Sequence, residues 1–165
     1  MDVIGFPNPV NEKAARVVAG GVALLSTLTL ALSAVDRTWL WLTAVLAYGF
    51  VARVLTGPRL SPLGQLATRV VAPRLGEPKL VAGPPKRFAQ SIGAAVTLTA
   101  VLLVALGADT GARGLLVVMV VFATLESVFA VCVGCKVFAA LMRAGVIPQD
   151  VCEACNDISR SWAPA

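Results

Sequence analysis

The stretch GLLVVMVVFATLESVFAVCVGC, residues 114–135, holds one charged residue, Glu126, and ends in a Cys-x-x-Cys pair. A transmembrane helix needs about 20 predominantly apolar residues to cross the ~30 Å hydrocarbon core of a bilayer. The stretch meets this requirement, so it predicts a membrane-spanning helix. Two thiols, Cys132 and Cys135, are expected where this helix leaves the bilayer.

Three further apolar stretches precede this one, at about residues 14–35, 39–55 and 88–108. Apolar residues make up 58% of the 165-residue chain and charged residues 14%, whereas soluble domains carry roughly 25% charged residues. The sequence therefore predicts an all-α integral membrane protein with four transmembrane helices. The expected organisation is a four-helix transmembrane domain, residues 1–144, followed by a Cys-containing tail, residues 145–165.

Basic residues are concentrated between the second and third stretches. From Arg53 to Arg87 this segment holds seven Lys or Arg side chains and one acid, Glu77. Loops that are rich in Lys and Arg stay on the cytoplasmic side of a membrane. We therefore expect a protein of the inner (plasma) membrane with this loop and both termini in the cytoplasm. Arg16 and Arg53 lie near span ends, and we expect them to extend their cationic groups to the lipid headgroups.

A short amphipathic helix is expected inside the basic loop. Its apolar residues follow one helical face: Leu63, Leu66, Ala67, Val70 and Val71. Ser61 is the expected N-cap, and Pro73 is expected to end the helix. The surrounding cationic residues favour a position in the cytoplasmic lipid interface.

Four segments carry a family resemblance: FPNPVNEKAARVVA (6–19), GPRLSPLGQLATRVVAPRLGEP (57–78), GPPKRFAQSIG (83–93) and FAVCVGCKVF (129–138). In this order they resemble a bacterial membrane-protein family, that of domain of unknown function 4395, over roughly residues 6–142. The resemblance implies a small multi-span membrane protein that associates with thioredoxin-like or sulfurtransferase proteins. It implies no established activity.

The chain departs from the family pattern in two places. The family more often has an acid after the second cysteine, where this chain has Lys136. The second cysteine pair, Cys152 and Cys155, lies beyond the part that resembles the family. A mechanism that needs all four cysteines would therefore be particular to this chain or to a subgroup.

The first cysteine pair is the expected reactive dithiol. Cys132 and Cys135 are three residues apart, so on a continuous helix they share a face. Lys136 would favour a thiolate here, because a nearby cation lowers the pKa of a thiol. A thiolate is the nucleophile in disulfide exchange and in persulfide transfer. The alternative is that both cysteines are small apolar residues packed in a helix.

The second pair, Cys152 and Cys155, lies in a polar tail among acids that oppose thiolate formation. We expect it to resolve, or to supply electrons to, the first pair. The four cysteines also have the spacing C-x2-C-x16-C-x2-C, which is typical of a structural zinc site. Under that alternative, zinc bound by Cys132, Cys135, Cys152 and Cys155 would hold the tail under the fourth span.

Glu126 lies inside the fourth stretch, where an ionised carboxylate is costly. We expect it to be a proton or cation site, to pair with a basic group elsewhere in the bundle, or to be protonated and hydrogen bonded within its helix. On a continuous helix it lies roughly opposite Cys135, so a single site that includes both is not expected.

The chain has no histidine, which excludes His-ligated haem, His-bearing zinc sites and Ser-His-Asp triads. Nucleic acid is not an expected partner, because topology alone explains a basic loop beside a membrane. The leading hypothesis is therefore a bilayer-embedded partner in thiol–disulfide redox or sulfur handling. A zinc-stabilised accessory subunit of a larger membrane complex is the alternative. A small transporter built around Glu126 is a third hypothesis, and it would require a homo-oligomer.

Overall fold

The computed structural model describes residues 5–148. Four helical segments are long and apolar enough to cross a membrane: α1 (Glu12–Ser33), Arg37–Thr56, α4 (Gly83–Ala105) and α5 (Asp109–Phe129). The second of these begins as a 3-10 helix, η1 (Arg37–Trp41), and continues as α2 (Leu42–Thr56). The prediction of an all-α protein with four transmembrane helices is confirmed, and the chain is a multi-pass membrane protein.

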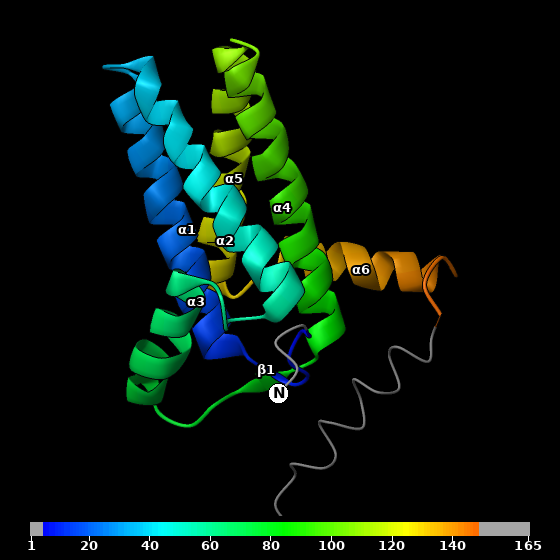
Figure 1. Ribbon diagram of the computed structural model, residues 1–165. Coiled ribbons are helices and arrows are strands. Elements are labelled where there is room, and N and C mark those ends of the chain that lie inside the picture. The colour runs from blue at the N-terminus through cyan, green and yellow to red at the C-terminus, as the bar shows by residue number, and fades with distance from the viewer. Residues whose placement is uncertain (1–4, 149–165) are drawn as a thin grey trace, which may run out of the picture.

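The four long helices run side by side in alternating directions (Figure 1). Helix α1 packs chiefly against α5, and α2 packs chiefly against α4. Short turns at residues 34–36 and 106–108 join the helices at one end of the bundle. The remaining segments, residues 5–11, 57–82 and 130–148, gather at the opposite end, which we call the foot. Large apolar side chains such as Leu24 and Leu102 are exposed on the bundle surface, where they contact lipid.

Two arginines hold α1 and α5 together by binding the end of the neighbouring helix. At the foot, Arg16 of α1 donates hydrogen bonds to the carbonyl oxygens of Ser127 (3.0 Å) and Val128 (3.1 Å) of α5. At the other end, Arg113 of α5 donates to the carbonyl oxygen of Ser33 of α1 (2.7 Å). The last carbonyls of a helix have no partner within it, and a cation there is favourable. Arg16 therefore binds the end of α5, and the prediction that it extends to the lipid headgroups is wrong.

The foot contains a two-stranded sheet in which β1 (Val10–Asn11) pairs antiparallel with β2 (Leu80–Val81). The basic loop between α2 and β2 winds through α3 (Pro62–Leu66), a π-helical turn η2 (Ala67–Val71) and a 3-10 turn η3 (Ala72–Leu75). This confirms the short helix predicted in the loop.

Ser61 is the N-cap of α3, as predicted, because its hydroxyl accepts a hydrogen bond from the backbone N–H of Gly64. The helical path runs past Pro73 to Leu75, since a proline is tolerated in the first turn of a new helical segment. Of the predicted apolar face, Ala67 is fully buried, whereas Leu66 remains half exposed. The loop helix thus packs onto the bundle with Leu63, which lies against Gly21 of α1, and with Ala67, and it leaves Leu66 and Val70 outside.

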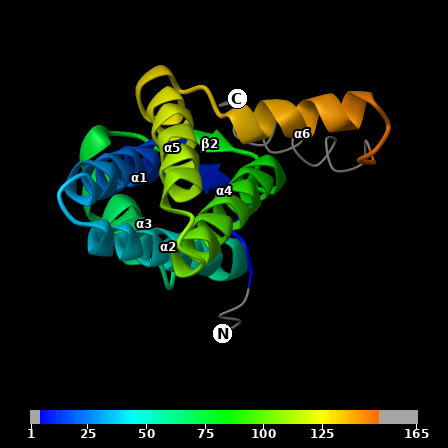
Figure 2. The ribbon, with the colours of Figure 1, turned by 90° about the horizontal axis from the view of Figure 1, so that it is seen from above.

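The fourth span is shorter than predicted. Helix α5 ends at Phe129, and Ala130 adopts a left-handed conformation with φ 56°. A separate helix, α6 (Val133–Arg143), follows and projects sideways from the bundle beside α4 (Figures 1 and 2). The expectation of one continuous helix from 114 to 135 is wrong. In a continuing helix the carbonyls of Ser127 and Val128 would accept N–H groups four residues ahead, whereas here they accept Arg16.

Close contact between α2 and α4 depends on a glycine. A Cβ atom added at Gly93 would collide with the ring of Phe50. That ring is 6% exposed, and the guanidinium carbon of Arg53 lies 4.5 Å from its centroid. One turn later, Thr97 is fully buried and donates its hydroxyl hydrogen to the carbonyl of Gly93 (2.7 Å). Small residues at this crossing let the two helices approach closely.

We expect Gly93→Ala to destabilise the bundle by about 1–3 kcal/mol, because the added methyl group overpacks a buried contact. The control is Gly114→Ala, since a Cβ there meets no atom within 4 Å. That change should be neutral or stabilise the helix by roughly 0.5–1 kcal/mol. Unfolding of the detergent-solubilised protein by increasing SDS measures both. Equal stability of the two variants would contradict the packing described here.

Candidate functional site

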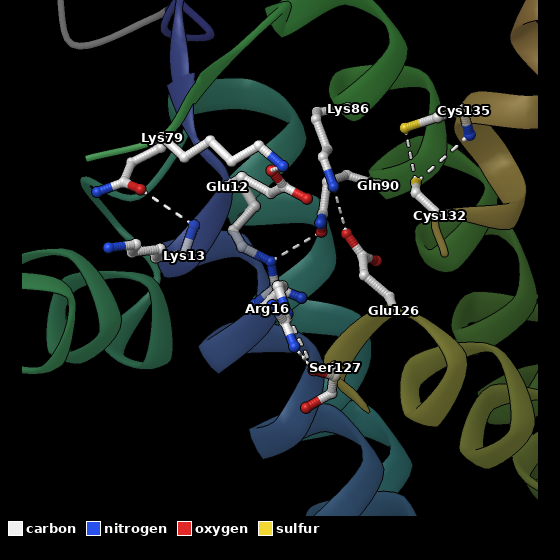
Figure 3. Close-up of polar contacts among 12 residues, drawn as sticks. Glu12, Lys13, Arg16, Lys79, Lys86, Gln90, Glu126, Ser127, Cys132 and Cys135 are labelled. Atoms are coloured by element: carbon white, nitrogen blue, oxygen red, sulfur yellow. Dashed lines mark hydrogen bonds and ion pairs between the residues drawn. The ribbon is translucent and has the colours of Figure 1, made fainter. Parts of the chain in front are cut away.

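The first cysteine pair lies at the start of α6, not inside a span. Cys132 is the N-cap of α6, and its sulfur accepts the backbone N–H of Cys135 (3.4 Å). The Sγ atoms of Cys132 and Cys135 lie 2.7 Å apart, and both residues are free thiols of intermediate burial (Figure 3). Disulfide formation between them needs only a small movement, since an S–S bond is about 2.05 Å long.

The two thiols differ in acidity. The hydrogen bond from the Cys135 thiol, together with that from the Cys135 backbone N–H, stabilises the Cys132 thiolate and lowers the pKa of Cys132. The same bond, together with burial, raises the pKa of Cys135. A thiolate at a helix N-terminus is further favoured by the helix dipole. Cys132 is therefore the more acidic thiol of the pair.

A buried ion pair lies beside the thiols. Lys86 Nζ of α4 is 2.7 Å from Glu126 Oε1 of α5, and both side chains are largely shielded from solvent (Figure 3). Of the roles expected for Glu126, pairing with a basic group elsewhere in the bundle is the one observed. A continuous helix would have placed Glu126 and Cys135 on opposite faces. The break after Phe129 instead turns the chain back, so that Glu126 and Cys132 line one cavity.

The cation that acts on the thiols is Lys86, not Lys136. Besides the dominant hydrogen bond from Cys135, the charge of Lys86 lowers the pKa of Cys132, whereas Glu126 raises it. Lys136 lies on the exposed side of α6. The sequence suggested Lys136 because it is adjacent along the chain. Lys86 is distant in sequence, and its position before the third span resembles an ordinary topology signal.

Helix α6 is fixed to α4 by a second close approach. A Cβ at Gly134, between the two cysteines, would lie 2.5 Å from Ala89 Cβ and 2.6 Å from Ala89 Cα. Further along, the rings of Phe88 and Phe138 have centroids 5.6 Å apart. Because a backbone atom of α4 sits against Gly134, the pair is held at a defined place beside Lys86.

An apolar cavity of about 260 Å³ extends from the pair into the bundle. Cys132, Glu126 and Gln90 are polar residues of its wall, and the rest is mainly apolar, including Val22, Met119 and Phe122. Phe122 is 41% exposed, so the cavity wall includes a side chain that reaches the lipid-facing surface. Cys132 thus lines a space within the bundle and also lies at the foot.

Arg53 and Gln90 complete the polar cluster at the foot. Arg53 Nε donates to Gln90 Oε1 (2.8 Å), and Nη1 donates to the hydroxyl of Ser61 (3.1 Å). Arg53 is only 6% exposed, so the prediction that it extends to the lipid headgroups is wrong. The sequence did not predict these hydrogen bonds of Arg53, because a position near a span end does not show which side of the helix faces the bundle.

Cys152 and Cys155 lie outside the described residues. Within residues 5–148, no group of three or more Cys, Asp or Glu side chains is arranged to hold a metal ion. The resolving role of the tail pair and the four-cysteine zinc site therefore stay predictions.

Comparison with known families places the chain. The model of the family described as a domain of unknown function, number 4395, matches residues 10–143. The chain belongs to this family, and the resemblance noted from the sequence is confirmed. No curated protein and no solved structure matches the chain.

The acidity of Cys132 should depend on the ion pair. Alkylation of Cys132 by iodoacetamide, followed by mass spectrometry across pH, should show a midpoint below the ordinary thiol value of about 8.5. Glu126→Gln should move the midpoint lower, because it removes an anion that opposes the thiolate. The double change Lys86→Gln, Glu126→Gln should raise it relative to Glu126→Gln, because it also removes the cation.

Lys136→Gln is the matched control, since it removes an exposed lysine next to the pair. Its midpoint should equal that of the unchanged protein. A shift in Lys136→Gln as large as that caused by losing Lys86 would contradict the assignment.

Proposed function

We propose that this member of the domain of unknown function 4395 family is a membrane partner in thiol–disulfide redox or sulfur handling, with Cys132 and Cys135 as its reactive pair. One observation carries the proposal: a free dithiol at the start of α6 in which the two sulfurs are 2.7 Å apart. The hydrogen bond between the two thiols lowers the pKa of Cys132 and raises that of Cys135. Cysteines that serve only as small apolar residues do not require such a bond.

The geometry supports a two-step exchange. The Cys132 thiolate attacks one sulfur of a partner disulfide, and the other partner sulfur leaves as a thiolate. Cys135 then loses its proton and attacks Cys132 Sγ, which releases the second partner sulfur. The pair is oxidised by two electrons to a disulfide, and the partner gains those electrons. Its two thiolates take up the proton lost by Cys135 and one proton from water. A persulfide partner would instead transfer its outer sulfur to Cys132 and leave as a thiolate.

The partner proposed is a thioredoxin-like or sulfurtransferase protein. Two features support this: α6 projects sideways from the bundle (Figure 2), and Cys132 and Cys135 at its start are only partly buried. The tail pair, Cys152 and Cys155, is proposed to return electrons to Cys132 and Cys135 by the reverse exchange. The pair of Cys132 and Cys135 would also lie at the foot if the protein formed a homo-oligomer or belonged to a larger membrane complex.

We further propose that the foot faces the cytoplasm from the inner membrane. The basic loop and α6 lie at the same end of the bundle, and Arg59, Arg69 and Arg74 belong to that loop (Figure 1). Lys and Arg in short loops favour the cytoplasmic side. Thiols in the cytoplasm are kept reduced, which suits a pair that cycles.

The exchange mechanism predicts opposite effects of the two cysteines. Cys135→Ser should accumulate a mixed disulfide with a thioredoxin-like protein whose own resolving cysteine has been replaced and whose remaining cysteine carries a thionitrobenzoate disulfide. The Cys132 thiolate displaces thionitrobenzoate, and no second thiol of the pair then releases the partner. Cys132→Ser should form none, because it lacks the nucleophile. Non-reducing electrophoresis and mass spectrometry of the adduct measure both, and Cys152→Ser with Cys155→Ser is the control that keeps the first pair intact. Adduct in Cys132→Ser equal to that in Cys135→Ser would refute the proposal.

The orientation predicts the activity of fused reporter enzymes. A reporter that is active only in the cytoplasm should be active after Ala165, and inactive when inserted at the turn of Gly107 and Ala108. A reporter that is active only outside the cytoplasm should show the reverse pattern. Cytoplasmic activity at the turn would overturn the proposed orientation.

A further inference from the structure

The charge of Arg53 is incompletely satisfied. The residue is 6% exposed, and its guanidinium group bonds only neutral partners, the amide of Gln90 and the hydroxyl of Ser61. Its third nitrogen, Nη2, is buried and has no hydrogen-bond partner among the described residues. Arg53 also forms no ion pair with any residue in the range 5–148. The charge of Glu126 acts on Arg53 from a distance, but Glu126 is bound to Lys86. A buried cation without a directly bound anion is costly, which points to a ligand.

A cavity of about 280 Å³ adjoins Arg53 at the foot. Arg53, Lys86 and Gln90 line it, together with apolar side chains such as Pro7, Ala15 and Leu80. None of the described residues that line it is acidic. Since one water occupies about 30 Å³ of liquid, this volume holds a small anion together with several waters.

Three polar side chains of this cavity, those of Arg53, Lys86 and Gln90, offer N–H donors, and Asn11 and Thr68 also line it. Gln90 Oε1 accepts from Arg53, so the amide NH2 of Gln90 can donate to a ligand. Lys86 has three N–H groups, one of which is used by Glu126. Donors from three side chains on two helices suit a tetrahedral anion with several acceptor oxygens better than they suit a planar carboxylate. Guanidinium groups bind such oxyanions in charge-assisted hydrogen bonds.

We propose that the cavity beside Arg53 binds a tetrahedral oxyanion, a sulfate, thiosulfate or phosphate group, either as a free ion or as the phosphate of a lipid headgroup. The site is separate from the exchange of thiols, since neither Cys132 nor Cys135 lines this cavity. Gln90 and Val18 line both cavities, so a bound oxyanion lies one residue layer from the space that Cys132 faces.

The test measures binding of sodium sulfate, thiosulfate and phosphate to the detergent-solubilised protein by calorimetry, with chloride at matched ionic strength as the reference. Arg53→Gln should weaken oxyanion binding by about 10–100-fold, the usual effect of losing one charge-assisted hydrogen bond. Arg69→Gln is the control, because it removes the same charge from an exposed position of the same loop, and it should bind like the unchanged protein.

Two further variants keep the test valid if Arg53→Gln does not fold. Arg53→Lys keeps the charge but removes the guanidinium fork, and Ala15→Leu keeps Arg53 but fills the cavity. Both should weaken oxyanion binding. Dodecyl phosphate distinguishes the two sources: binding of this probe alone, lost in Ala15→Leu, identifies a lipid phosphate as the ligand. Equal binding by Arg69→Gln and all cavity variants, or no binding of any probe by the unchanged protein, would overturn the proposal.

Discussion

The foot of the bundle depends on the hydrogen bonds that Arg16 donates to the last carbonyls of α5. The carbonyl oxygens of Ser127 and Val128 accept hydrogen bonds from the Arg16 guanidinium, so they do not require N–H groups from a further helical turn. The helix can therefore stop while the sequence is still apolar. The chain then turns through Ala130 and begins again at Cys132, so a cysteine that would have lain in a span becomes the N-cap of a surface helix.

The charged side chains at the foot are linked to one another through shared contacts. Lys86 is shared between its ion pair with Glu126 and its effect on the Cys132 thiolate. Arg53 is held by Gln90 and stacks over Phe50, a ring that also seats against Gly93. Polar side chains at this depth are favourable only when neighbouring helices supply partners. Packing of α2 against α4 and the electrostatics of the thiol site are therefore linked through the same side chains.

Local chemistry made much of the fold predictable. Span number and approximate limits follow from length and hydropathy, and the Ser61 cap follows from a residue preference that acts over three positions. The end of α5 was not predictable in this way, because its cause is Arg16, which lies over a hundred residues away in sequence. The pairing of Lys86 with Glu126 is equally non-local. The sequence of α6 did offer a signal, because Phe138 and Met142 are four residues apart and so share one helical face, apart from Lys136. In the structure Phe138 and Met142 are buried and Lys136 is exposed.

The pairing of helices has a consequence for biogenesis. Helices α1 and α2 enter the membrane first, yet each finds its main partner later in the chain, α1 in α5 and α2 in α4. Until then α1 and α2, which carry the fully buried Ser26 and Thr43, lack their main partners. The strand β1 likewise waits for β2, which is synthesised only after the whole basic loop. The main contacts of the first hairpin can therefore form only after the second hairpin has been synthesised.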